Sequence, residues 1–361
     1  MVALTEQLPP SHAEGSVDRF SPDATFALTS PYHGSWLSHI YGGHFQNLYP
    51  AKVVRESDFR EWLCMISERP ELMFMGNFIV DRAGIVALCR EHGINVIHCE
   101  DGFFPHYGNA HGDPLGFCWE SSLPQLTFRS VTDEQRAQAQ ASRQRWLEFA
   151  PEPLPAVIRE PFVLWPLQLV GDKVNQWDLN EKNWCDLLRH FRACLPGEFQ
   201  LVIKAHPRSK PQDSAGVAEL VRELPNTVLL PARAHLKTSL SKCHAVAGAN
   251  STVLLEARLM FHKPVYAYAR GWFTNHFELF QPVHARHAPR KLSRFECVEN
   301  HRLARTERLD DYTDWFLAQL LARQVSLERG KADPIWLKEK VHHLSYKSFV
   351  QHGEDIFHRF D

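Results

Sequence analysis

The order of apolar and polar positions predicts alternating strands and helices in the first half of the chain. Residues 25–30 (TFALTS) are expected to form a strand, and residues 58–67 space their apolar side chains along one helical face. The elements expected next are a strand at 72–75, a helix at 81–92 ended by Gly93, and a strand at 95–99. This order is that of βαβ units.

The alternation resumes after a proline-rich segment. A polar helix is expected at 132–149, and the four prolines of 151–161 (PEPLPAVIREP) cannot all lie inside regular elements. The later strands are expected at 162–165, 200–204, 227–230, 245–247 and 264–268, and the later helices at 181–194, 215–224, 234–241, 252–261, 311–323 and 334–360. The second half is therefore another α/β layer structure.

Length and composition refine this picture. A chain of 361 residues with 44% hydrophobic and 23% charged residues favours two folded domains. The predicted division is a loose leader at 1–22, a first domain at 23–150, a linker at 151–161, a second domain at 162–325 and a helical tail at 326–361. A net charge of -2 gives no general attraction to nucleic acid, which is not an expected partner.

Cysteine usage and hydropathy indicate the compartment. The eight cysteines lie singly, without a CxxC pair, and are expected to be reduced thiols. Neither a signal peptide nor a run long enough to span a membrane is evident. We expect a cytoplasmic protein, and the basic, aromatic tail leaves peripheral contact with the inner membrane open.

Two motifs in the second half follow predicted strands, where parallel sheets bind ligands. In LVIKAHPRS, His206 before Pro207 can donate to or protonate a leaving phosphate, and Lys204 can add charge; alternatively, His206 only caps the strand. In VAGANSTVLLEARLMFHKPVYAY, a turn from Asn250 through Ser251 to Thr252 begins a helix. Its free amides and hydroxyls make an anion site, or Ser251 only caps the helix.

Acidic residues mark three further positions. Glu256, one turn into that helix, can accept hydrogen bonds from ribose hydroxyls or be a plain exposed carboxylate. In NVIHCEDGFF, Glu100 with Asp101 after it can act as a general base on an acceptor hydroxyl, or both can be solvated loop residues. Gln168 and Asp172 follow the first strand of the second half, and Asp172 is either a cleft residue or a turn aspartate.

Other familiar signatures are missing from the sequence. The 21 histidines show no ligand spacing such as HExxH, so a catalytic metal is not expected. The absence of GxGxxG, Walker and GxSxG motifs argues against dinucleotide oxidoreductases, P-loop enzymes and α/β-hydrolases.

Taken in order, these motifs resemble the capsule polysaccharide biosynthesis family and, within it, the retaining β-Kdo glycosyltransferases of capsule and lipopolysaccharide O-antigen synthesis. The resemblance covers roughly residues 70–270. It rests on the motif at 100–103, Gln168 with Asp172, Lys204 with His206 and Pro207, Ser251 and Thr252 with Glu256, and the Lys-Pro pair at 263–264. It implies a GT-B-like α/β fold, two Rossmann-like domains facing a central cleft, with a tail that returns to the first domain.

The resemblance also implies a reaction. The implied donor is CMP-Kdo, where Kdo is 3-deoxy-D-manno-oct-2-ulosonic acid, and the implied acceptor is a glycan or lipid-linked glycan. Asp172 is the expected nucleophile of a covalent adduct, Glu100 the base, and His206 the group that stabilises or protonates departing CMP. His206 and Ser251 meet the phosphate, and Lys204 holds the phosphate or the sugar carboxylate. No metal or other cofactor is expected.

Two alternatives remain on the sequence alone. An inverting UDP-sugar transferase or an epimerase-like enzyme of the same fold would use the 250–264 pattern equally well, and Asp172 would then be dispensable. A non-catalytic subunit for capsule assembly or export would bind a glycan or nucleotide without turnover, but it would not need Glu100, Asp172 and His206 together.

Overall fold

Two units make up the chain in a computed structural model. The structure describes residues 25–29, 51–55, 59–65, 72–75, 82–104, 108–117, 120–128, 130–169, 184–209, 215–268, 273, 276, 279–282 and 307–357. One unit joins Met1–Ser122 to Gln319–Asp361, and the other is Leu123–Ala318. Each unit contains its own six-stranded sheet.

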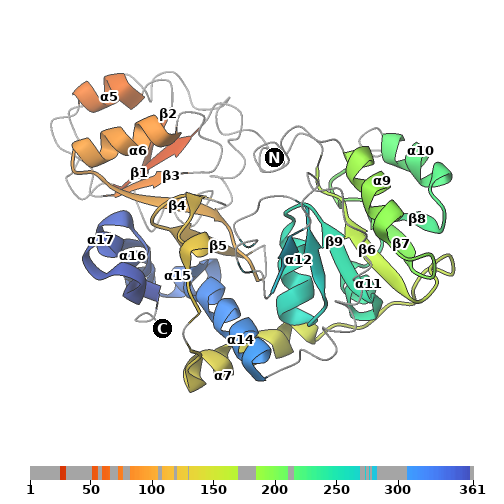
Figure 1. Cartoon of the computed structure of the whole chain (residues 1–361). Helices are drawn as coiled ribbons and strands as arrows, with labels where there is room; N and C mark the ends of the chain where they lie inside the picture. Colours follow the sequence, from red (N-terminus) through yellow and green to blue (C-terminus); the bar gives the residue numbers. More distant parts are fainter. Residues whose placement is uncertain are drawn as a thin grey trace. The chain divides into compact units, whose positions relative to one another are not determined.

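The sheet of the first unit is mostly parallel (Figure 1). Its strands are β1 (Thr25–Thr29), β2 (Ala51–Arg55), β3 (Leu72–Met75), β4 (Asn95–Asp101), β5 (Asn109–Asp113) and β12 (Gln324–Ser326), in the order β12-β5-β4-β3-β1-β2. The pairs formed by β1 to β4 are parallel, whereas β5 is antiparallel to both β4 and β12. The C-terminal part of the chain therefore supplies the edge strand of the N-terminal sheet.

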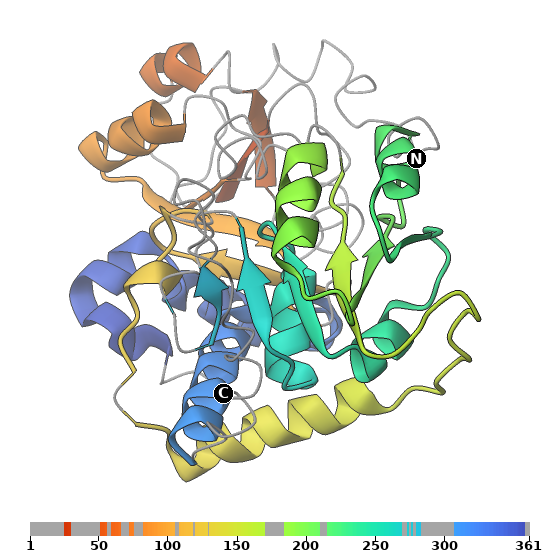
Figure 2. The same cartoon turned by 45° about the vertical axis from the view of Figure 1, so that its right-hand side comes forward.

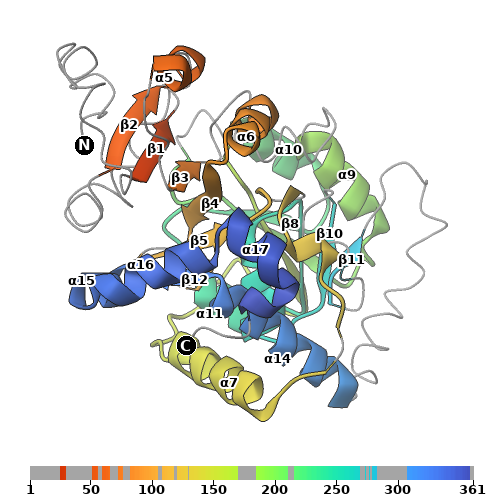
Figure 3. The same cartoon turned by 90° about the vertical axis from the view of Figure 1, so that its left-hand side faces the viewer.

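Helices cover both faces of this sheet. On one face lie α5 (Phe59–Met65) and α6 (Arg82–Glu91), whose apolar side chains pack on Met73 and Val96. On the other face lie α16 (Pro334–His343), α17 (Tyr346–His352) and the 3-10 helix η8 (Gly353–Phe357), preceded by α15 (Leu327–Ala332) (Figure 3). The C-terminal helices therefore pack within the first unit, on the sheet formed mostly by the N-terminal part of the chain.

The sheet of the second unit is parallel throughout. Its strands are β6 (Phe162–Pro166), β7 (Gln200–Lys204), β8 (Thr227–Leu230), β9 (Ala245–Gly248), β10 (Val265–Ala267) and β11 (Gln281–Pro282), in the order β11-β10-β9-β6-β7-β8. Read by chain position, this is the doubly wound order 3-2-1-4-5-6. The chain reverses its direction of travel across the sheet between β6 and β9, and ligands of such sheets bind beyond the strand ends at this point.

Two helix layers enclose this sheet. On one face, α9 (Trp184–Cys194) and α10 (Ala215–Glu223) pack on the apolar side chains of β6, β7 and β9. On the other lie α11 (Leu236–Lys242) and α12 (Thr252–Leu255), which continues as the π-helix η7 (Glu256–Met260) (Figure 1). The unit also contains η5 (Leu123–Gln125), α7 (Asp133–Leu147) and most of α14 (Glu307–Ala322).

Helix α7 belongs to the second unit through its side chains. Its first turn is closed by a capping box between Thr132 and Gln135. Arg143 donates from Nε to the carbonyl oxygen of Leu259 and from Nη2 to Oδ1 of Asp314, both at 2.8 Å. Figure 2 shows α7 running beside the helices of the second sheet. The contacts divide the chain at 122–123, ahead of the predicted linker at 151–161, because α7 packs with these helices.

The predicted fold class, α/β with two Rossmann-like sheets, is confirmed. The strands predicted at 72–75, 200–204 and 227–230 have those bounds in the structure, and most predicted helices differ from the observed ones by a few residues. The sequence did not predict β2, β5, β11 or β12. The helix predicted at 252–261 is present as α12 followed directly by η7, whose hydrogen bonds are those of a π-helix.

Candidate functional site

Most predicted donor-site residues lie at one edge of the second sheet. Gln168 follows β6, His206 follows β7, and Asn250 follows β9. These strands are neighbours in the order β9-β6-β7, so all three residues lie beyond the carboxyl ends of adjacent parallel strands. With neighbouring strands about 4.8 Å apart, these strand ends span about 10 Å. The edge includes the point where the strand order reverses.

Gln168 and Asn250 bond to each other across that point. The Nε2 group of Gln168 donates to Oδ1 of Asn250 at 2.8 Å, and the backbone N–H of Asn250 donates to Oε1 of Gln168 at 3.4 Å. Asn250 is buried, whereas Gln168 is half-buried. The structure therefore brings together two residues that the sequence predicted separately.

The turn after β9 leads directly into a helix. Ser251 caps α12, because its Oγ accepts from the N–H of Val253 at 3.3 Å and its carbonyl oxygen accepts from Leu254. Within the described part of the chain, the N–H groups of Ser251 and Thr252 have no hydrogen-bond acceptor. Capping by Ser251 is thus compatible with an anion at these two amides, which carry the positive end of the helix dipole.

His206 has a defined tautomer in this structure. The N–H of Arg208 donates to its Nδ1 at 3.1 Å, and the carbonyl oxygen of His206 accepts from Ser209 in the same turn. Since Nδ1 accepts a hydrogen bond, the proton of the neutral ring is on Nε2. Pro207 is exposed within this turn and presents no donor. The neutral imidazole therefore carries its donor group on Nε2.

Lys204 ends β7 and has internal partners. It is 3% exposed, and its ammonium donates to the carbonyl oxygens of Ala205 at 3.2 Å and Ala232 at 3.1 Å. Burial lowers the pKa of this ammonium. Ala232 lies after β8, on the side of β7 away from β6, so Lys204 ties two loops together. Its predicted contact with the donor stays a prediction.

Glu256 is half-buried at the start of η7. Burial raises the pKa of its carboxyl to about 7, and the charge of Lys237 opposes that shift. Lys237 donates to the carbonyl oxygen of Trp146 at 2.8 Å, with its ammonium 4.0 Å from the centre of the Trp146 ring. Lys237 was not predicted as a partner of Glu256, because the sequence does not indicate that α11 and η7 come close in the fold.

In the first unit, Glu100 is half-buried in β4 and Asp101 ends that strand, with a side chain outside those described. Gly102 is required there, since a Cβ would lie 2.5 Å from Cβ of Asn109. The backbone register places Glu100 opposite His111 of β5, so both side chains lie on the same face of the sheet.

The segment after Glu100 is fixed by Gln324 of β12. Oε1 of Gln324 accepts from the N–H groups of Phe103 and Phe104 at 2.7 and 2.6 Å, and its Nε2 donates to the carbonyl oxygen of Phe104 at 3.0 Å. Both phenylalanines are buried. We did not predict these hydrogen bonds, because the only signal in the sequence is a single polar residue, Gln324, far along the chain from Phe103 and Phe104.

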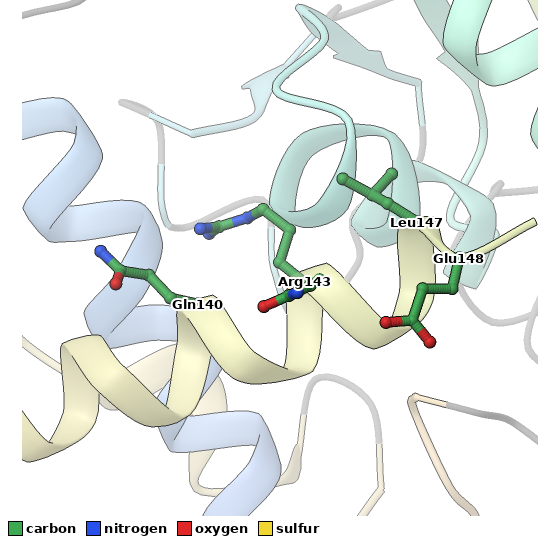
Figure 4. Close-up of a pocket in the computed structure, with 5 residues that line it drawn as sticks. Gln140, Arg143, Leu147 and Glu148 are labelled. Carbon is green, nitrogen blue, oxygen red and sulfur yellow. The ribbon is translucent and has the colours of Figure 1, made fainter.

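Asp172, the predicted nucleophile, lies outside the described residues. A hollow of about 520 Å³ lies along α7, lined by Gln140, Arg143, Gln144, Leu147 and Glu148 (Figure 4).

Among the described residues, no three His, Cys, Asp or Glu side chains converge as a metal site would require. No helix within those ranges is both long and apolar enough to cross a bilayer.

Comparisons with known proteins agree with the motifs. Residues 129–276 match the family model described as capsule polysaccharide biosynthesis protein. The fold is similar to that of Thermosulfurimonas dismutans KpsC, beta Kdo 2,7 transferase, at 16% identity and a TM-score of 0.52, over 87% of this chain and 99% of that one. The beta Kdo 2,4 transferase of the same KpsC matches at 15% identity and 0.52, over 82% and 90%. No curated protein sequence gives a significant match.

Proposed function

Because the chain matches the capsule polysaccharide biosynthesis family over residues 129–276, we propose that it is a glycosyltransferase that transfers Kdo from CMP-Kdo to a glycan with retention. The observation that carries the proposal is the position of the motif residues. Gln168, His206 and Asn250 follow three adjacent strands at the reversal of the strand order, in a fold shared with two β-Kdo transferases.

The donor's phosphate would bind at the start of α12. The N–H groups of Ser251 and Thr252 are suited to an anion. His206, whose Nε2–H would be a further donor, follows β7, which is separated from β9 only by β6. Glu256, once ionised, would accept hydrogen bonds from the ribose hydroxyls. The two backbone N–H groups and the Nε2–H of His206 would thus supply hydrogen-bond donors to the phosphate without a metal ion.

The reaction would take two displacements at the anomeric carbon of Kdo. In the first, a carboxylate oxygen of Asp172 forms a bond to this carbon while the bond to the CMP phosphate oxygen breaks, and CMP leaves with the bonding electrons. In the second, Glu100 takes the proton of an acceptor hydroxyl, whose oxygen attacks the same carbon and releases Asp172. Two inversions give net retention.

His206 would stabilise the leaving CMP by hydrogen bonding. Its Nδ1 accepts from Arg208, so the neutral ring has one proton, on Nε2. Giving up this proton would leave an imidazolate, which is unfavourable near neutral pH. Of the two roles that the sequence left open for His206, stabilisation by a shared proton therefore fits the geometry better than protonation.

The acceptor would be a glycan or a lipid-linked glycan of capsule or lipopolysaccharide synthesis. A lipid-linked acceptor would require the enzyme to act at the inner face of the cytoplasmic membrane, as a peripheral protein. Vesicle flotation with and without such an acceptor lipid would test this part separately.

The decisive experiment is intact-protein mass spectrometry after mixing the purified chain with CMP-Kdo in the absence of acceptor. A mass increase of one Kdo unit on the wild type, absent from Asp172→Asn, would support donor, mechanism and nucleophile together. Asp172→Asn should still bind CMP. If the chain binds UDP but not CMP, the Kdo assignment falls and the UDP-sugar alternative replaces it. Nucleotide binding without any turnover would favour a non-catalytic subunit.

A further inference from the structure

Strands β6 and β9 separate before their carboxyl ends. Their register pairs are Val163 with Ala245 and Leu164 with Val246. Beyond these, β6 continues along β7 as far as Pro166 opposite Lys204, and β9 continues along β10 as far as 248 opposite 267. The two central strands thus follow different neighbours as they approach the edge where a ligand would bind.

The side chains of Gln168 and Asn250 span this separation. They make the two hydrogen bonds of 2.8 and 3.4 Å between the segments that leave β6 and β9. The backbone on both sides is held by its own strand partner, since the N–H of Leu167 donates to the carbonyl oxygen of Lys204 and that of Tyr268 to Gly248. The amide bridge therefore links two stiff segments where the backbone ladder has ended.

The bridge also determines which groups of the turn can meet an anion. The N–H of Asn250 is bonded to Oε1 of Gln168, which leaves the next two N–H groups, those of Ser251 and Thr252. Because the backbone N–H needs an oxygen, the amide of Gln168 can face Asn250 in one orientation only, and its Nε2 then meets Oδ1. The bond from the backbone N–H of Asn250 thus fixes the amide of Gln168 in the orientation that the side-chain bond requires.

We propose that Gln168 is a positioning residue: through Asn250 it sets the spacing of β6 and β9 at the strand reversal and holds the 250–252 turn for the phosphate of a nucleotide. The role in binding rests on the proposed function. It concerns the phosphate alone, so it is the same for a cytosine and a uracil nucleotide. Gln168 need not touch the phosphate, since it acts through Asn250.

A double-mutant cycle tests this. Gln168→Met keeps the length of the side chain without its hydrogen bonds, Asn250→Ala removes the other partner, and the third variant combines them. CMP affinity is measured by calorimetry, and urea unfolding of each variant reports its stability. Gln140→Met, at an exposed glutamine of α7, is the matched control. Each single variant should lose about tenfold in CMP affinity. The double variant should lose no more affinity than the single variant that binds CMP less tightly.

Other outcomes would be equally informative. A double variant whose losses multiply, or single variants that bind CMP like Gln140→Met, would overturn the positioning role while leaving the proposed function intact. Lower stability with unchanged affinity of the folded protein would show a purely structural bridge, and would also overturn it. If the wild type binds UDP and not CMP, the proposed donor is wrong, and the same cycle run with UDP still decides the role of Gln168. Binding of neither nucleotide would overturn both proposals.

Discussion

The guanidinium of Arg323 lies 3.8 Å from Oδ2 of Asp113, and both side chains are almost completely buried. Ser122 bonds to both, because its N–H and Oγ donate to Asp113 and its Oγ accepts from Arg323. The guanidinium carbon of Arg323 also lies 3.4 Å from the centre of the Phe357 ring. This cluster ties the segment after β5 to the C-terminal part of the chain.

Replacing Arg323 should destabilise the first unit strongly. Arg323→Met would leave the carboxylate of Asp113 buried without its cation, and the loss of a partner from a buried ion pair costs about 3–5 kcal/mol. Urea unfolding followed by circular dichroism would measure the loss. Arg189→Met is the control, since Arg189 and Asp186 form an exposed pair at 3.3 Å, worth about 0–1 kcal/mol. Equal losses in the two variants would contradict a stabilising role for the buried pair.

The sequence predicted the apolar strands well. The segments at 72–75 and 200–204 are apolar runs bounded by turn signals, and such a pattern reflects burial on both faces of a parallel sheet. In contrast, β5 has the sequence NAHGD and β12 has QVS, which lack an apolar run. Backbone pairing with neighbouring strands, and not an apolar pattern, determines their strand conformation. The partner of β12 is a segment more than two hundred residues earlier in the chain.

The candidate site was predictable to the extent that it depends on strand ends. Parallel strands bring their carboxyl ends to one edge, so residues after β6, β7 and β9 were expected together, and the bond of Gln168 to Asn250 agrees with this. The internal partners of Lys204 were not predictable, because a lysine at the end of a strand gives the same sequence pattern whether it contacts a ligand or carbonyl groups of the chain. The contribution of Lys237 likewise depends on how two helices meet.

His206 should act as a neutral hydrogen-bond donor. Glutamine carries an N–H group near the position of Nε2, so His206→Gln should retain CMP affinity within about threefold, whereas His206→Phe should lose about tenfold or more. Calorimetric titration with CMP would measure both. Weak binding by both variants would indicate that a charged imidazolium is needed, and would contradict the tautomer deduced from the bond to Arg208.

Removal of metal ions should leave the first chemical step intact. The proposed phosphate contacts are the N–H groups of Ser251 and Thr252 and the Nε2–H of His206, which need no metal. Formation of the Kdo adduct on the wild type, measured by intact mass, should therefore proceed at the same rate in excess EDTA and in added magnesium. A rate that falls in EDTA and returns with magnesium would count against this arrangement.

The stability of the second unit should depend on the protonation of Glu256. Its pKa is about 7 when folded against a usual 4.5, so the folded chain binds the extra proton between these values. The free energy of unfolding should therefore fall as pH rises from 4.5 to 7, by up to about 3 kcal/mol, and then level off. Urea unfolding of wild type and Glu256→Gln across this range should show curves that diverge, with Glu219→Gln, at an exposed position, as the control. Parallel curves would exclude a raised pKa.

Nucleoside binding should have the opposite dependence on pH. If the ionised carboxylate of Glu256 accepts hydrogen bonds from ribose hydroxyls, the competent form is about one tenth populated at pH 6 and dominant at pH 8, given a pKa of about 7. Wild-type affinity for cytidine, which does not itself titrate in this range, should rise by about tenfold between these values. Glu256→Gln should bind with little change, since its amide has no charge to gain. An affinity that rises equally in both proteins would assign the titration to another group and remove Glu256 from the ribose site.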